Sequence, residues 1–248
     1  MAQPVETPEL PTINVAERGR GADGKPISLD RRLFMQFMAL GNCPNVSAVT
    51  DMLTAENPQA TLYQDLHDPT GLGLLLFSEN ADYLLDTINS LFSQPALADC
   101  HVKPEYTMLG RTYSIGYESD LEEVLIRRPV TRVCNPDLPW SIWYPVRRSG
   151  EFERESADQQ KKMLMEHGGI GHAFGKAGYA TDIRLAAHGL NKEDNDFIVG
   201  LLGKDLFPLS ALVQRMRRTR QTSEFIKNMG PFFIGRVVWQ TSAERDWK

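Results

Sequence analysis

Apolar and polar positions in the first half of the chain follow the order strand, helix, strand, strand, helix, strand. The predicted strands cover residues 33–40, 61–66, 72–77 and 105–113, and the predicted helices cover 46–54 and 81–92. The strand segments are short apolar runs bounded by charged residues or glycine, which is typical of buried strands. In the second helix, Leu84, Ile88 and Leu91 recur at helical spacing and define one apolar face. This order of elements predicts a ferredoxin-like unit.

The second half of the chain repeats this order of elements, although not the same residues. Its predicted strands cover 140–146, 183–187, 197–202 and 232–239, and its predicted helices cover 156–167 and 208–218. Ser156 followed by Gln159 is typical of a helix start, and Gly168-Gly169 is expected to end that helix directly after His167. The predicted fold class is therefore α+β, with two ferredoxin-like (β-α-β-β-α-β) halves forming a dimeric α+β barrel-like unit.

Composition shifts along the chain predict four regions. Residues 1–28 contain prolines, glycines and charges without an apolar signal segment, and are expected to form a flexible N-terminal arm. Residues 29–115 form the N-terminal half, 116–139 a charged and proline-containing connector, and 140–248 the C-terminal half, in which we expect the functional site.

The overall composition narrows the classes of function. Hydrophobic residues make up 42% and charged residues 24% of the 248, and the net charge of -5 gives no reason to expect a nucleic-acid partner. No apolar run approaches the roughly 18 residues of a membrane span, so a cytoplasmic protein is expected. Cys43, Cys100 and Cys134 are odd in number and far apart, which predicts idle thiols rather than a disulfide framework or a zinc site.

Among the five histidines, His167 is the candidate that shares a predicted helix with inward-facing apolar residues, Met163 and Leu164. Taken alone, a histidine at a helix end is more commonly a cap or a core residue. A helix C-terminus also favours the imidazolium form, which cannot bind a metal. The common nucleotide-binding, zinc-protease and nucleophile motifs do not occur. The residue pattern by itself therefore does not choose a function.

Residues 140–240 resemble the C-terminal half of the chlorite dismutase-like haem proteins, which include chlorite dismutases and coproheme decarboxylases. The similar stretches occur in the family's order: Tyr144–Arg148, Leu164–Gly168, His188–Leu190, Asn195–Phe197, Met216–Ser223 and Gly230–Gly235. The resemblance implies haem b or coproheme as the cofactor, with His167 as the ligand of its iron. A cofactor-free α+β barrel of the monooxygenase or stress-response kind is the alternative that a Soret absorption band would exclude.

Tyr144, Arg148, Arg218 and Ser223 match positions of the coproheme decarboxylases. In that resemblance, hydrogen peroxide supplies the oxidising equivalent, Tyr144 passes it to a haem propionate, and the other three residues hold the propionates. Arg148 stands where the family has lysine, which keeps the charge but changes its geometry. The alternative for Tyr144 is a buried core tyrosine.

Arg184 is the residue that resembles the anion-binding distal arginine of chlorite dismutases. It falls at that position when residues are counted back from Phe197, but counting forward from His167 requires an insertion within 175–181. The alternative is an ordinary strand-edge arginine paired with Asp182. Phe152 and Glu153 replace family tryptophans, which counts against an efficient chlorite dismutase.

The expected function is a haem-binding oxidoreductase that uses hydrogen peroxide or chlorite at a histidine-ligated iron. Coproheme decarboxylation ranks first, and chlorite dismutation second. A non-enzymatic haem carrier or sensor is the alternative outside enzymes, and it would require His167 but neither Arg184 nor Tyr144. The resemblance also implies a ring-shaped homo-oligomer, expected to be a pentamer.

Overall fold

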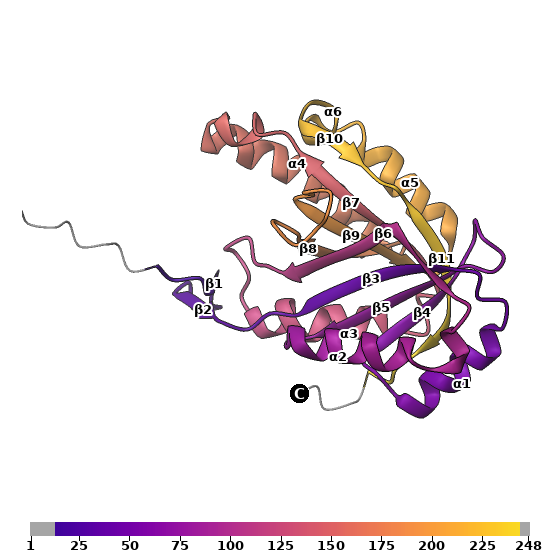
Figure 1. Ribbon diagram of the computed structural model, residues 1–248. Helices are drawn as coiled ribbons and strands as arrows, with labels where there is room; N and C mark the ends of the chain where they lie inside the picture. Colours follow the sequence, from indigo (N-terminus) through magenta and orange to yellow (C-terminus); the bar gives the residue numbers. More distant parts are fainter. Residues whose placement is uncertain (1–12, 244–248) are drawn as a thin grey trace, which may run out of the picture.

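The computed structural model describes residues 13–243, and its N-terminal half is a ferredoxin-like unit (Figure 1). The elements follow the order β3 (Phe34–Gly41), α1 (Val46–Glu56), β4 (Ala60–Asp65), β5 (Leu72–Ser78), α2 (Ala81–Phe92) and β6 (His101–Thr112). A short 3-10 turn, η1 (Pro95–Leu97), precedes β6. The four strands are antiparallel in the order β4-β5-β3-β6. Each of the six predicted elements is confirmed, with boundaries shifted by a few residues.

The C-terminal half has the same topology. Its elements are β7 (Trp140–Arg148), α4 (Ala157–Lys176), β8 (Thr181–Ala186), β9 (Phe197–Gly203), α5 (Leu206–Met216) and β11 (Phe233–Gln240). The strand order is β8-β9-β7-β11, which matches the order in the first half. Three short elements are added: η3 (Phe152–Arg154) after β7, and α6 (Arg220–Phe225) and β10 (Ile226–Met229) between α5 and β11.

The two sheets join at both edges and close into a barrel. Strand β6 pairs with β8 at one seam, and β11 pairs with β4 at the other. Alternate side chains point inward, where the ring of Phe37 lies 4.7 Å from that of Phe233 and 5.7 Å from that of Trp143. Gly200 lies against Trp143, and a Cβ atom there would approach the indole to 2.5 Å. The predicted α+β class with two ferredoxin-like halves is confirmed.

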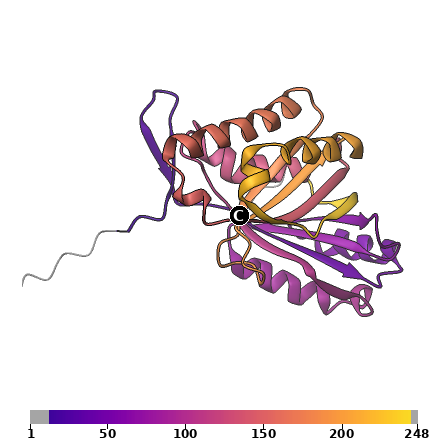
Figure 2. The same cartoon turned by 90° about the horizontal axis from the view of Figure 1, so that it is seen from above.

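Helices cover the outer faces of the barrel. Helices α1 and α2 pack on the first sheet, and α4 and α5 pack side by side on the second (Figure 2). No helix within residues 13–243 is long and apolar enough to cross a membrane.

The connector between the halves contains helical structure that the sequence analysis did not predict. A helical turn, η2 (Glu123–Arg127), leads into α3 (Arg128–Val133). Leu125 and Val130 belong to the same buried cluster as the inward-facing strand residues. The Thr61 hydroxyl donates a hydrogen bond of 2.9 Å to the Val133 carbonyl oxygen. The connector is therefore part of the barrel core, and the proposed domain boundaries stay predictions.

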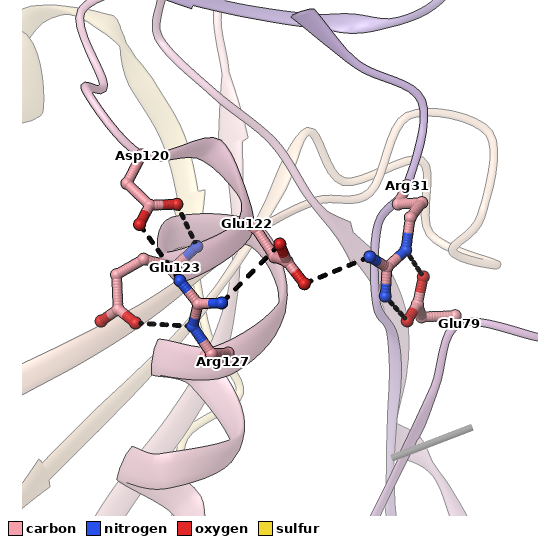
Figure 3. Close-up of polar contacts among 6 residues, drawn as sticks. All are labelled: Arg31, Glu79, Asp120, Glu122, Glu123 and Arg127. Carbon is pink, nitrogen blue, oxygen red and sulfur yellow. Dashed lines mark hydrogen bonds and ion pairs between the residues drawn. The ribbon is translucent and has the colours of Figure 1, made fainter. Parts of the chain in front are cut away.

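An ion-pair network ties the connector to the N-terminal half (Figure 3). Arg31 pairs with Glu79 at 2.6 Å and with Glu122 at 3.2 Å. Arg127 in turn lies 3.7 Å from Glu122, and it also pairs with Asp120 and Glu123. Exposed pairs contribute little singly, so the network marks a surface contact between the connector and the N-terminal half and adds little stability.

Helix α4 does not end after His167, contrary to the sequence prediction. It runs on through Gly168-Gly169 to Lys176. Each interior glycine costs about 1 kcal/mol relative to alanine, and Gly171 and Gly175 lie in the same helix. Ile170 and Phe174 offset this cost because both pack against the second sheet beyond the glycines. Tertiary contacts therefore override the local stop signal.

The N-terminal arm and the cysteines also differ from expectation. Residues 1–12 lie outside the described part, but β1 (Glu17–Arg20) and β2 (Pro26–Leu29) form a hairpin where a flexible arm was expected. The Glu17 carboxylate accepts a hydrogen bond from the Ser114 backbone N–H at 2.9 Å, which anchors this hairpin. Cys43 and Cys100 are joined as a disulfide, so the prediction of idle thiols is wrong for this pair; Cys134 is a buried free thiol.

Candidate functional site

The site is built on the outer face of the second sheet, beneath α4 and α5. Inward-facing Trp143 and Ile198 belong to the barrel core, so their neighbours Tyr144 and Val199 face the helices. Strand register places Arg184 opposite Val199, and Val199 opposite Tyr144. The three residues form one row across β8, β9 and β7. Because neighbouring strands lie ~4.8 Å apart, Arg184 and Tyr144 start roughly 10 Å from each other on one face.

His167 approaches this row from α4. Met163, one turn before it, is buried, and Ile170, just under one turn after it, packs against the sheet, so the three share the inward side of the helix. Burial lowers the pKa of His167, and the positive charge of Arg184 lowers it further. The imidazole is therefore neutral at neutral pH, as a metal ligand must be.

Thr219 contacts the His167 ring. The distance from His167 Nδ1 to Thr219 Oγ1 is 3.3 Å, and Thr219 is 1% exposed. The Thr219 hydroxyl also lies 2.8 Å from the Met216 carbonyl oxygen, to which it must donate its proton. Its lone pair is then available to accept from Nδ1–H, which leaves the Nε2 lone pair free.

Tyr144 is buried, with 6% of its surface exposed, and its ring stacks on Phe232 at a centroid distance of 4.6 Å. Burial raises the pKa of its phenol well above the ordinary value, Asp182 raises it further, and the charge of Arg217 acts in the opposite direction. The phenol is therefore protonated at physiological pH. These properties fit both a redox-active tyrosine and the alternative of a core tyrosine.

Arg148 is already engaged by neighbouring side chains. Its guanidinium lies 2.7 Å from Glu153 Oε1, 4.1 Å from the centre of the Phe152 ring and 5.1 Å from that of Phe197. Arg148, Phe152 and Glu153 are three positions at which this chain departs from the family pattern described above, and they touch one another. The three substitutions therefore occur together, because Arg148 pairs with Glu153 and stacks on Phe152.

Arg218 and Ser223 lie at the end of α5 and in α6. Arg218 is exposed, and its guanidinium makes no hydrogen bond or ion pair with another residue of 13–243. The Ser223 hydroxyl donates to the Thr219 carbonyl oxygen at 3.0 Å. Arg217, which the sequence analysis did not select, is the arginine of this segment whose charge acts on Tyr144.

Arg184 projects from the outer face of β8, with its side chain 54% exposed. Its Nε atom lies 3.2 Å from Asp182 Oδ2, which is the pairing that the alternative interpretation described. The other histidines are placed differently from His167. His172 is exposed on α4, and His188 Nδ1 lies 3.5 Å from Asp196 Oδ1.

The set of donors around His167 limits which metal centre is possible. Within residues 13–243, no group of three or more histidine, cysteine, aspartate or glutamate side chains is arranged to hold a metal ion. A metal bound here would need its other ligands from the cofactor itself, as a porphyrin supplies. Leu164, three residues before His167, was expected to face inward but is 47% exposed, so its apolar side chain would be available to a flat ring bound beside His167. The residues present therefore fit a haem.

Comparison with known proteins identifies the family. The family model described as chlorite dismutase matches residues 48–238, which is most of the chain. The chain belongs to the chlorite dismutase family. A comparison with curated proteins finds no significant sequence match.

Solved structures share the fold at low sequence identity. A novel heme-binding protein from Thermus thermophilus is 18% identical, with a TM-score of 0.66 over 84% of this chain and 91% of that protein. A mutant chlorite dismutase from Candidatus Nitrospira defluvii, in complex with cyanide, is 14% identical, with a TM-score of 0.64 over 84% of this chain and 92% of that one. At these identities the likeness establishes the fold.

Proposed function

We propose that this protein binds haem b or coproheme through His167 and acts as a haem-dependent oxidoreductase. One observation carries the proposal. Thr219 engages Nδ1 of a neutral His167 on the inward side of α4, the helix that covers the sheet face carrying the row of Arg184, Val199 and Tyr144. Partners of this kind fix the orientation and the tautomer of metal-binding histidines. The family includes enzymes, and the Thermus relative is described as heme-binding.

We assign the chain's own residues the following tasks. Hydrogen peroxide or chlorite would supply the oxidising equivalents, and a bound haem would be the centre that accepts them. Arg184 contributes a positive charge to the outer face of the sheet, where an anionic oxidant or its product would be stabilised. Tyr144 holds a phenolic proton in a buried position and can give up that proton together with an electron.

Coproheme decarboxylation is the activity we favour, because Tyr144 is buried on the sheet face that α4, the helix of His167, covers. The arginines at the end of α5 are the better candidates for holding propionates. Arg217 and Arg218 make no ion pair within the described residues, whereas Arg148 would have to leave Glu153 and Phe152. The Ser223 hydroxyl would likewise have to exchange its bond to Thr219 for a propionate.

Chlorite dismutation is the second candidate, and Arg184 is the observation that favours it. Its positive charge lowers the pKa of His167. An anionic oxidant bound on the sheet face beneath α4 would therefore lie near the Arg184 guanidinium. A haem carrier or sensor is the third candidate, since His167 and Thr219 suffice for it.

The test is to add coproheme to the purified protein, then hydrogen peroxide, and to follow the porphyrin mass. Loss of mass as carbon dioxide supports the decarboxylase. A parallel sample of the haem-loaded protein receives chlorite instead of peroxide, and oxygen release there, with no loss of porphyrin mass in the first sample, supports the chlorite dismutase. Tight haem binding with neither activity supports the carrier.

The cytoplasmic location and the ring-shaped homo-oligomer, a pentamer, are further proposals that rest on the resemblance to the family. Light scattering after size-exclusion chromatography tests the assembly. A particle of one or two chain masses would contradict a pentamer.

A further inference from the structure

A small cavity separates the connector helix from the seam between β6 and β8. It has a volume of about 40 Å³, and its walls include Tyr113 on the β6 side, Arg128 and Arg132 on α3, and Asp182 and Arg184 on β8. Three of its lining residues are therefore positively charged and one is negatively charged. The cavity is bounded by the connector instead of α4, and it shares Arg184 with the sheet face beneath His167.

Asp182 cannot neutralise this cluster. Its carboxylate is shared between two arginines: Oδ1 lies 3.6 Å from Arg132 Nη1, and Oδ2 lies 3.2 Å from Arg184 Nε. Arg128 has a carboxylate of its own, Glu123, at 3.3 Å. Arg132 and Arg184 carry two positive charges and share the single negative charge of Asp182, so one positive charge of this pair is not balanced.

Arg132 is the most enclosed of the three arginines. One Nη1–H donates to the Asp182 backbone carbonyl, which orients the guanidinium beside the cavity. Burial lowers the pKa of Arg132, and the charges of Arg128 and Arg184 lower it further, whereas Asp182 raises it. A partly buried guanidinium with two like charges around it gains most from an added anion.

Tyr113 adds a neutral hydrogen-bond donor. Burial raises the pKa of its phenol, so the hydroxyl keeps its proton at physiological pH. The cavity thus offers guanidinium N–H groups and a phenolic O–H, which are the donors that an oxyanion accepts.

We propose that this cavity binds a small monovalent anion, such as a halide or an oxyanion of a few heavy atoms, between Arg132 and Arg184. The volume of about 40 Å³ sets the size limit, since it exceeds the room for one water molecule but excludes a bulky organic anion. Binding here requires no haem. An anion bound here would lie next to Arg184, from which it could pass to the sheet face beneath His167. Only this passage to the sheet face rests on the proposed function.

Nitrite is the probe, titrated into the purified protein by calorimetry at constant ionic strength, with sodium gluconate as the balancing salt. The wild type should bind nitrite saturably. Arg132→Gln should bind at least about tenfold more weakly, because a charged hydrogen bond is lost. Arg127→Gln is the matched control, since Arg127 also lies in the connector but pairs with surface carboxylates. It should bind like the wild type.

Two further variants keep the test decisive. Asp182→Asn removes the competing carboxylate and should strengthen nitrite binding, an effect opposite to that of general destabilisation. His167→Ala should retain the heat of binding, which separates this cavity from nitrite binding at a haem iron. No saturable binding in the wild type, or equal binding by Arg132→Gln and Arg127→Gln, would overturn the proposal. Loss of binding in His167→Ala would place the anion at the haem instead.

Discussion

His167 on α4 and Thr219 at the start of α6 are joined by a contact of 3.3 Å between Nδ1 and Oγ1. Thr219 is also the N-cap of α6, and its hydroxyl oxygen accepts from the Thr222 backbone N–H. One threonine therefore starts a helix and orients the candidate ligand. The two tasks are coupled, because any shift of the α6 start moves the oxygen that His167 contacts.

Thr219→Val should weaken haem binding by about 10- to 100-fold, the range typical of lost partners to metal-binding histidines. Valine keeps the volume but removes the acceptor for Nδ1–H. The measurement is a haem titration followed by Soret absorbance, together with the iron–histidine stretching frequency.

Thr219→Ser is the control for that change, because serine keeps both the hydroxyl and the helix cap. It should restore most of the affinity and the stretching frequency. Equal affinity in Thr219→Val and the wild type would show that the contact does not support the ligand.

Tyr144→Phe should retain coproheme but fail to lose carbon dioxide when hydrogen peroxide is added. Phenylalanine keeps the ring that stacks on Phe232, so the fold should survive, but it lacks the phenolic proton. Mass spectrometry of the porphyrin gives the result. Tyr179→Phe, an exposed tyrosine beyond the end of α4, is the matched control and should react like the wild type. Normal decarboxylation by Tyr144→Phe would leave the core-tyrosine interpretation.

Arg184→Gln should leave haem affinity unchanged and weaken cyanide or fluoride binding by the ferric protein. The guanidinium provides a fixed positive charge on the face that an anion would approach. Turnover of chlorite or peroxide should fall by about tenfold or more, as when one electrostatic stabiliser is removed. Unchanged anion affinity would place Arg184 outside the site, as a strand-edge partner of Asp182.

Glu153→Gln should show whether Arg148 can hold a propionate. The substitution removes the carboxylate 2.7 Å from the Arg148 guanidinium and leaves the Phe152 contact in place. If Arg148 holds a propionate, coproheme affinity should rise severalfold, measured by fluorescence quenching. Glu224→Gln, on the exposed surface of α6, is the control. Unchanged affinity in both variants would show that Arg148 does not hold a propionate.

Short apolar runs bounded by charged residues or glycine were sufficient to predict the barrel strands, because both faces of these strands are buried, one in the barrel core and the other under the helices. Trp143 and Tyr144 illustrate this, since consecutive residues of one strand face opposite sides of the sheet. The end of α4 could not be predicted from Gly168-Gly169, because the contacts of Phe174 with the second sheet decide it. Local signals are weak against such packing.

The site residues that the sequence did not predict, Thr219 and Arg217, are brought to the site by contacts between distant segments. Thr219 is 52 residues from His167, and no local pattern joins them. Thr219 lies within the Met216–Ser223 stretch that resembles the family, and a threonine in front of a short polar helix is typical of an N-cap, but neither signal links it to His167. Arg217 and Arg218 are adjacent in the sequence, so only the direction of the turn after α5 distinguishes them.

Haem titration of His167→Ala against the wild type tests the central claim most directly. The wild type should form a sharp Soret band at one haem per chain, and His167→Ala should lose it or give the band of weakly held haem while keeping its circular dichroism spectrum. His172→Ala, five residues further along the same helix and exposed, should bind like the wild type. Full haem binding by His167→Ala, with loss in His172→Ala, would contradict the account.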